Sequence, residues 1–256
     1  MRNWRVYVKR SLFGVLALLS PTLTVHAEEA APPDPPNTQW LSYNGNVNGQ
    51  RYADLRQINT GNVAQLGEIC RLQVDDAGSF HSGIVQVDGT LFVTTATDTL
   101  AVDATTCALR WRHHYDTQEH GGTALQVNRG VAYASGRLFR GTVDGRLLAI
   151  DAKDGATLWQ YQIGDPQQGE FFAAAPQVFQ GLVIIGAAGG DWGIRGRVMA
   201  FDAATGREVW RFYTIPQGDD PGAESWKNAP SARYGGGGTW TTYTLHKAAG
   251  GGFLSA

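Results

Sequence analysis

The segment Met199–Arg211 reads MAFDAATGREVWR, and two close copies of it occur earlier in the chain. The copies are Leu100–Arg112 (LAVDATTCALRWR) and Leu148–Gln160 (LAIDAKDGATLWQ). Their aspartates fall 48 and 51 residues apart, and the tryptophans near their ends keep the same spacing. Internal similarity at a fixed period indicates a repeated structural unit rather than one irregular core.

Each copy has the pattern of a β-hairpin. An alternating strand leads into an aspartate whose carboxylate can accept N–H groups of a turn, and a second strand then ends near tryptophan. Two copies have a glycine in the turn, Gly155 or Gly206, where a positive φ is expected, but the first copy has Cys107 there. We interpret the repeated tryptophans as packing residues between neighbouring units and assign them no chemistry.

Further strand pairs are predicted upstream of the hairpins, at Gly83–Thr95, Gly130–Gly141 and Ala173–Ala187. Four short strands for every 48 to 51 residues is typical of a β-propeller blade. The sequence therefore predicts an all-β fold, an incomplete β-propeller of about three four-stranded blades with the start of a fourth at 239–256. Because an open ring exposes an unpaired blade face, we expect further C-terminal blades or a partner chain to close it.

Residues 1–27 have the features of a secretory signal peptide. Basic residues precede the apolar run Leu12–Leu19, and Val25 and Ala27 are placed for cleavage. The run is shorter than the roughly twenty residues of a membrane span, so we expect export to the periplasm, with an uncleaved anchor as the alternative. Residues 28–39 are expected to form a disordered Pro-rich leader, and residues 40–256 the partial propeller.

Charge and cysteine content narrow the function further. The net charge is −2 and no basic cluster is present, which argues against a nucleic-acid partner and favours a small or neutral substrate. Cys70 and Cys107 could form a disulfide in an oxidising compartment or remain two separate thiols. A side chain at position 107 suggests an altered turn, such as one held by a disulfide. Neither cysteine has a second Cys or His at zinc-site spacing.

Several stretches outside the blade repeat resemble the pyrroloquinoline quinone (PQQ) dependent alcohol and sugar dehydrogenases, which are periplasmic eight-bladed propellers. The resemblance runs from RYADLRQINTGNVAQL (51–66) through VNRGVAY (127–133) and GGDWGIRG (189–196) to GGGGTW (235–240). It implies oxidation of an alcohol, polyol or sugar by hydride transfer to metal-bound PQQ. It also implies electron transfer to a cytochrome c or to ubiquinone.

The resemblance assigns roles to individual residues. Arg129 matches an arginine that binds a carboxylate of PQQ, and Thr142 matches a hydroxyl that contacts the cofactor. Trp240 matches the indole on which the quinone stacks. Gly190 lies in the matching cofactor loop, and Asp191 matches the acidic ligand of a Ca²⁺ or Mg²⁺ ion beside the quinone.

No catalytic residue is predicted within this chain, because the family's aspartate base would lie beyond Ala256. We therefore expect that the chain alone does not turn over substrate. Arg195 is expected to tie down loop carbonyls rather than to contact the cofactor. The alternative function is a non-catalytic periplasmic propeller that serves as a binding or assembly scaffold. Such a scaffold would keep the hairpins but would have no need of VNRG, GGDWGIRG or GGGGTW.

Overall fold

The computed structural model describes residues 38–74, 78–117, 125–227, 231–233 and 235–245. The expected signal peptide, most of the expected leader and the segment 246–256 lie outside these residues. No helix in the described ranges is long and apolar enough to cross a membrane.

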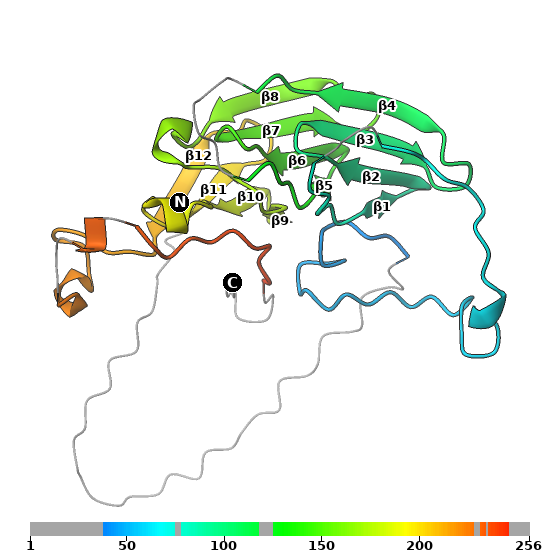
Figure 1. Ribbon diagram of the computed structural model, residues 1–256, viewed down its shortest axis with the longest axis horizontal. Coiled ribbons are helices and arrows are strands. Elements are labelled where there is room, and N and C mark those ends of the chain that lie inside the picture. The colour runs from blue at the N-terminus through cyan, green and yellow to red at the C-terminus, as the bar shows by residue number, and fades with distance from the viewer. Residues whose placement is uncertain (1–37, 75–77, 118–124, 228–230, 234, 246–256) are drawn as a thin grey trace, which may run out of the picture. The chain divides into compact units, whose positions relative to one another are not determined.

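Twelve strands in the described ranges form three four-stranded antiparallel sheets, which follow one another along the chain (Figure 1). The first sheet contains β1 (Val85–Val87), β2 (Thr90–Thr94), β3 (Asp98–Asp103) and β4 (Leu109–His114). The second contains β5 (Ala132–Ala134), β6 (Arg137–Gly141), β7 (Arg146–Asp151) and β8 (Thr157–Gln162). The third contains β9 (Gln177–Phe179), β10 (Leu182–Gly186), β11 (Arg197–Asp202) and β12 (Glu208–Tyr213).

In every sheet the spatial order of the strands is the order of the sequence, which is the meander of a propeller blade. The predicted all-β fold of an incomplete propeller is confirmed. In the described ranges, short 3₁₀ helices occur outside the sheets, at η1 (Val63–Gln65), η2 (Pro166–Gln168), η3 (Gly190–Trp192), η4 (Ala223–Ser225) and η5 (Ser231–Arg233).

The aspartate at the end of each third strand closes the hairpin turn, as the repeat predicts. Asp103 Oδ1 accepts the N–H of Thr105 at 2.9 Å. Asp151 and Asp202 accept the N–H two residues further on at 2.8 and 3.1 Å. Each carboxylate thus accepts hydrogen bonds from turn N–H groups that have no partner in the strand pairing. This explains why the aspartate recurs in every turn.

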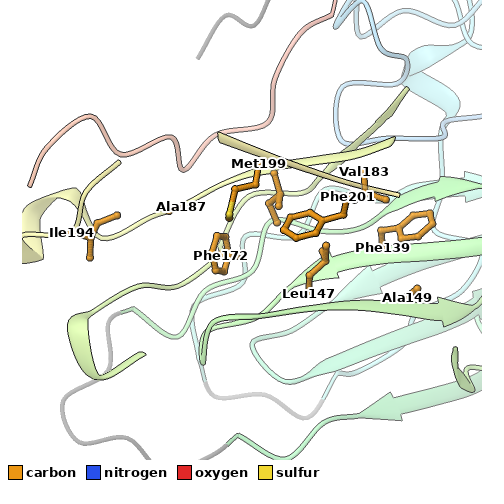
Figure 2. Packing of buried hydrophobic residues seen from close by; sticks show 10 residues of the cluster. Phe139, Leu147, Ala149, Phe172, Val183, Ala187, Ile194, Met199 and Phe201 are labelled. Carbon is orange, nitrogen blue, oxygen red and sulfur yellow. The ribbon is translucent and has the colours of Figure 1, made fainter. Parts of the chain in front are cut away.

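The core lies between consecutive sheets. Phe139 and Leu147 of the second sheet pack against Val183, Met199 and Phe201 of the third (Figure 2), and all five side chains are buried. A second buried cluster joins the first sheet to the second in the same way. Burial of apolar side chains on both facing surfaces is therefore what holds the stack together.

Two of the three repeated tryptophans, Trp111 and Trp159, each connect their sheet to the next, as predicted. Trp111 Nε1 donates at 3.2 Å to a carbonyl in the turn after β7, and Trp159 Nε1 donates at 3.4 Å to the equivalent carbonyl after β11. The glycines of those turns lie against the indole rings. A Cβ added at Gly155 or Gly206 would come within 2.8 Å of Trp111 or Trp159. We call each contact between a tryptophan and the turn glycine of the next sheet a seam.

A buried arginine also joins the first two sheets. Arg140 of β6 is fully buried, and its guanidinium donates to the carbonyl oxygens of Thr95, Ala96 and Asp98 at 3.2, 3.0 and 2.7 Å. The guanidinium also lies over the Tyr115 ring, 4.9 Å from its centroid. Burial lowers the pKa of Arg140, and the three carbonyls supply the acceptors that a buried cation needs.

The segment that precedes β1 contains no strand within its described residues. Its only regular element there is η1. Cys70 is joined to Cys107 by a disulfide with a Cα–Cα distance of 5.7 Å. The structure thus has a disulfide where the sequence left the pairing open. It fastens this segment to the β3–β4 turn of the first sheet.

Candidate functional site

A hollow of about 350 Å³ lies where the loops of the second and third sheets meet residues 236–240. Most of its wall is glycine, alanine or large apolar side chains, among them Leu125, Phe171 and Trp192. Arg129 and Asp191 are the only charged residues among the described residues that line it. A largely apolar hollow with one cation and one anion suits a planar ligand that carries a carboxylate.

The Asn-Arg-Gly motif holds Arg129 by backbone contacts. The Asn128 side chain accepts the N–H of Gly130 and donates to the Gly141 carbonyl, both at 2.9 Å. Gly130 has a φ of 124°, and a Cβ there would meet the carbonyl oxygen of Gly83 at 2.8 Å. The asparagine and the glycine are thus required by the turn, and they fix the point from which the Arg129 side chain extends.

The Arg129 guanidinium lies over the indole of Trp240, with its carbon 4.5 Å from the ring centroid. Burial lowers the pKa of Arg129, but an arginine remains protonated at neutral pH. Among the described residues, no acidic side chain forms an ion pair with it. Trp240 is 49% exposed. A cation and an open aromatic surface are therefore presented together at the hollow.

The Gly189–Gly196 loop brings Asp191 to the edge of the same hollow. Gly189 and Gly193 flank η3 with φ values of 109° and 87°, a conformation that favours glycine. A Cβ at Gly190 would lie 3.3 Å from the backbone nitrogen of Gly238, so the two glycine segments pass close together. Asp191 itself is exposed. The glycines thus fix the loop, and the carboxylate is left available for a ligand.

Arg195 does not line the hollow but supports the loop, as predicted. Its Nε donates to the Ile215 carbonyl at 2.9 Å, and its guanidinium forms an ion pair with Asp220. It also lies over the Tyr213 ring, 3.7 Å from the centroid. These three contacts give the Arg195 guanidinium a structural role.

A buried ion pair that the sequence analysis missed supports the position of Trp240. Glu170 binds Arg197 through two contacts of 2.5 and 2.7 Å. Burial alone would raise the pKa of Glu170, but the hydrogen bonds from Arg197 outweigh it and hold the pKa below its usual value. The Arg197 carbonyl accepts the Thr239 hydroxyl at 2.9 Å, next to Trp240. No local sequence signal links partners 27 residues apart.

The structure brings four of the predicted site residues, Arg129, Gly190, Asp191 and Trp240, around one hollow. It places Thr142 elsewhere. Thr142 is fully buried in the β6–β7 turn, and its hydroxyl donates to Asp144 at 2.6 Å and accepts the N–H of Arg146 at 2.8 Å. These two bonds account for Thr142 as a turn residue.

The metal expectation rests on Asp191 alone. In the ranges that the structure describes, no group of three or more His, Cys, Asp or Glu side chains is arranged to hold a metal ion. A Ca²⁺ ion takes six to eight oxygen ligands. Asp191 could supply one or two of them.

Comparisons with known proteins agree with the fold. The family described as "Glucose/ethanol/alcohol dehydrogenase, beta-propeller domain" (PQQ) matches residues 40–255. Quinohemoprotein alcohol dehydrogenase ADH IIB of Pseudomonas putida is 35% identical over 216 residues, which are 78% of this chain and 31% of that protein. The lanthanide-dependent methanol dehydrogenase of Methylacidiphilum fumariolicum is 34% identical over 82% of this chain and 38% of its own length.

Two solved structures have the same arrangement of strands. Quinohemoprotein alcohol dehydrogenase ADHIIG of Pseudomonas putida superposes with a TM-score of 0.78 at 34% identity, over 83% of this chain and 33% of that one. A europium-containing methanol dehydrogenase superposes with a TM-score of 0.76 at 31% identity, over 82% and 41%. The chain thus spans about a third of the length of the curated relatives it matches. With its three meander sheets and its match over residues 40–255, this chain belongs to the family of PQQ-dependent alcohol dehydrogenases.

Proposed function

We propose that this chain supplies the N-terminal part of an exported, periplasmic PQQ-dependent dehydrogenase that oxidises an alcohol, polyol or sugar. The hollow around Arg129 and Trp240 is its contribution to the quinone site. The observation that carries the proposal is the placement of Arg129 over the open Trp240 ring, on a hollow otherwise lined by glycine and apolar side chains. The relatives with matching sequences are dehydrogenases, which favours this function over a non-catalytic scaffold.

The residues present fit a planar quinone with carboxylate substituents. The Arg129 guanidinium binds one carboxylate through its planar fork of N–H donors. The Trp240 indole offers the surface on which the ring system stacks. Gly190 and Gly238 have no side chains, so a flat ligand can approach their backbone closely. Because Arg129 covers one face of Trp240, stacking on that face requires the guanidinium to move from the ring to the ligand carboxylate.

Asp191 is proposed as one ligand of a Ca²⁺ or Mg²⁺ ion beside the quinone. When bound, PQQ supplies the electrophilic carbonyl that accepts a hydride from the substrate. Asp191 is the only acidic residue among the described residues that line the hollow. Binding a cation lowers the basicity of a carboxylate, so we expect the base that removes the substrate's hydroxyl proton to come from elsewhere. Electrons would then pass to a cytochrome c or to ubiquinone.

The test is a calorimetric titration of the purified chain with PQQ, with and without Ca²⁺. We expect binding that is weakened tenfold or more by Arg129→Ala and by Trp240→Ala. Arg207→Ala removes an exposed arginine of the β11–β12 turn, away from the hollow, and is the matched control. Equal binding by all three variants would rule out this hollow as the quinone site. PQQ-dependent dye reduction by the chain alone would contradict the need for an additional base.

A further inference from the structure

A histidine lies beside the seam between the first two sheets, where the other sheets carry an aromatic ring. His113 comes two residues after Trp111 in β4. Tyr161 takes the corresponding place in β8, and Phe212 takes it in β12. Of these three side chains, only the imidazole changes its charge near neutral pH. The first interface between sheets therefore contains a titratable group that the hairpin repeat does not require.

The His113 side chain faces the second sheet. Its Nε2 lies 2.9 Å from the hydroxyl oxygen of Thr157 at the start of β8. The ring is partly buried, and its Nδ1 is buried without a hydrogen-bond partner among the described residues. Because a buried N–H without an acceptor is unfavourable, we assign the hydrogen of the neutral ring to Nε2, which then donates to Thr157. Protonation would place a new N–H at Nδ1, where the described residues offer it no acceptor.

A buried cation lies on the same side of the first sheet. Thr99 is directly opposite His113 in the β3–β4 register, so both side chains point to the same face. Arg140 Nη1 donates to the Thr99 hydroxyl at 3.0 Å, and the Arg140 side chain is fully buried. A proton on His113 would therefore add a second positive charge near the first, in a place where water screens them poorly.

The other charged groups near His113 do not offset this cost. Asp98 favours the protonated ring, but its carboxylate already binds Arg112 and His114. His114 repels the added charge when it is itself protonated. Burial lowers the pKa of His113, and the charge of Arg140 lowers it further. The interface is thus built around the neutral histidine.

The second interface is apolar at the equivalent places. Tyr161 lies opposite Leu147 in the β7–β8 register. Leu147 and Ile185 belong to one buried apolar cluster between the second and third sheets. Ile185 is the fourth residue of β10, the place that Arg140 holds in β6. Mild acid therefore has no comparable group to protonate at this interface.

We propose that His113 makes the first seam acid-sensitive: its neutral ring fastens β4 to β8, and its protonation loosens the contact of Trp111 with the second sheet. The folded pKa of His113 is lower than its unfolded pKa of about 6.5, so the stabilisation is complete above that pH. It is lost as the pH falls toward the folded pKa, and the loss levels off below it. The inference does not depend on the quinone site.

Two indole N–H groups report on the two seams separately. Trp111 Nε1 donates to the Ala152 carbonyl across the first seam, and Trp159 Nε1 donates to the Ala203 carbonyl across the second. NMR measures the protection of both against hydrogen exchange between about pH 7.5 and pH 5, relative to the intrinsic rate at each pH. We expect the protection of Trp111 to fall by about threefold or more and that of Trp159 to stay constant. An equal fall at both indoles, or none at Trp111, overturns the proposal.

A substitution copied from the second sheet separates His113 from other effects of acid. His113→Tyr reproduces Tyr161, and we expect it to make the protection of Trp111 independent of pH over the same range. His81→Asn, at an exposed histidine, is the control and should keep the wild-type pH dependence. Wild-type pH dependence in His113→Tyr overturns the proposal.

An NMR titration of the wild-type ring keeps the proposal testable if His113→Tyr fails to fold. The His113 ring protons should titrate at a lower pH in the folded chain than in the chain unfolded in urea. The same pKa in both states, or a higher one in the folded chain, overturns the proposal.

Discussion

The guanidinium carbon of Arg129 lies 4.5 Å from the centroid of the Trp240 ring. Arg129 precedes the second sheet and Trp240 follows the third, and both line one hollow. The π surface of the indole stabilises the positive charge of Arg129, while the N–H groups of the guanidinium remain available to a ligand. The geometry thus presents a cation together with a stacking surface.

Arg129→Lys separates the charge of Arg129 from its shape. Lysine keeps the cation but loses the planar fork, so we expect PQQ to bind roughly ten- to a hundredfold more weakly, the worth of one charge-assisted hydrogen bond. Calorimetric titration at two salt concentrations measures the change. An unchanged dissociation constant would mean that the fork does not bind a carboxylate.

Asp191→Asn tests the proposed metal ligand. Because the side chain is exposed, we expect the free energy of unfolding to stay within about 0.5 kcal/mol of the wild-type value. The strengthening of PQQ binding by Ca²⁺ should be lost. Asp219→Asn, at another exposed carboxylate, is the control and should keep the Ca²⁺ effect. A full Ca²⁺ effect in Asp191→Asn would remove this residue from the metal site.

Gly155→Ala tests the seam between the first and second sheets. Alanine is strained at the Gly155 φ of 79°, and its added Cβ would also lie only 2.8 Å from the Trp111 ring. The substitution therefore combines backbone strain with a steric clash. Gly181→Ala is the control, because φ is 78° but nothing lies within 4 Å of the new Cβ. We expect Gly181→Ala to lower the free energy of unfolding by about 1 kcal/mol, and Gly155→Ala by a further 1 to 3 kcal/mol. Urea unfolding measures the free energy of unfolding of both variants. Equal losses would show that the Trp111 ring moves away from the new Cβ at no cost in stability.

Glu170→Gln tests the ion pair beneath the site. The folded pKa of Glu170 is lower than its unfolded pKa, so ionised Glu170 stabilises the fold above about pH 4.3. This stability is lost as the pH falls through the folded pKa. We expect the glutamine variant to be less stable by about 3 kcal/mol at pH 7, and its stability to vary less between pH 5 and pH 3. Urea unfolding across this range measures the difference, and parallel pH profiles would contradict it.

The fold could be predicted because its determinants are local and repeated. Asp103, Asp151 and Asp202 mark the turns, and Trp111 and Trp159 mark the seams, so the period of the sequence was enough to place all three sheets. The partner of Cys107 could not be identified in the same way, because only the folded chain brings Cys70 beside the β3–β4 turn.

The site could be predicted only in part. Arg129, Asp191 and Trp240 lie in short glycine-containing motifs that can be recognised in the sequence. In the structure, these three residues line one hollow. Thr142 also lies in a short glycine-containing motif, but its hydroxyl bonds to Asp144 and to the N–H of Arg146 within the β6–β7 turn. The apolar wall and the Glu170–Arg197 pair join residues distant in sequence, so only the fold reveals them.

Arg140 makes the first and second sheets a single cooperative unit. Its guanidinium donates to three carbonyls across the interface. Separating the sheets would break these hydrogen bonds and leave the cation and its acceptors without partners until water reached them. A half-opened state is therefore costly, and the two sheets should lose their slow amide exchange together.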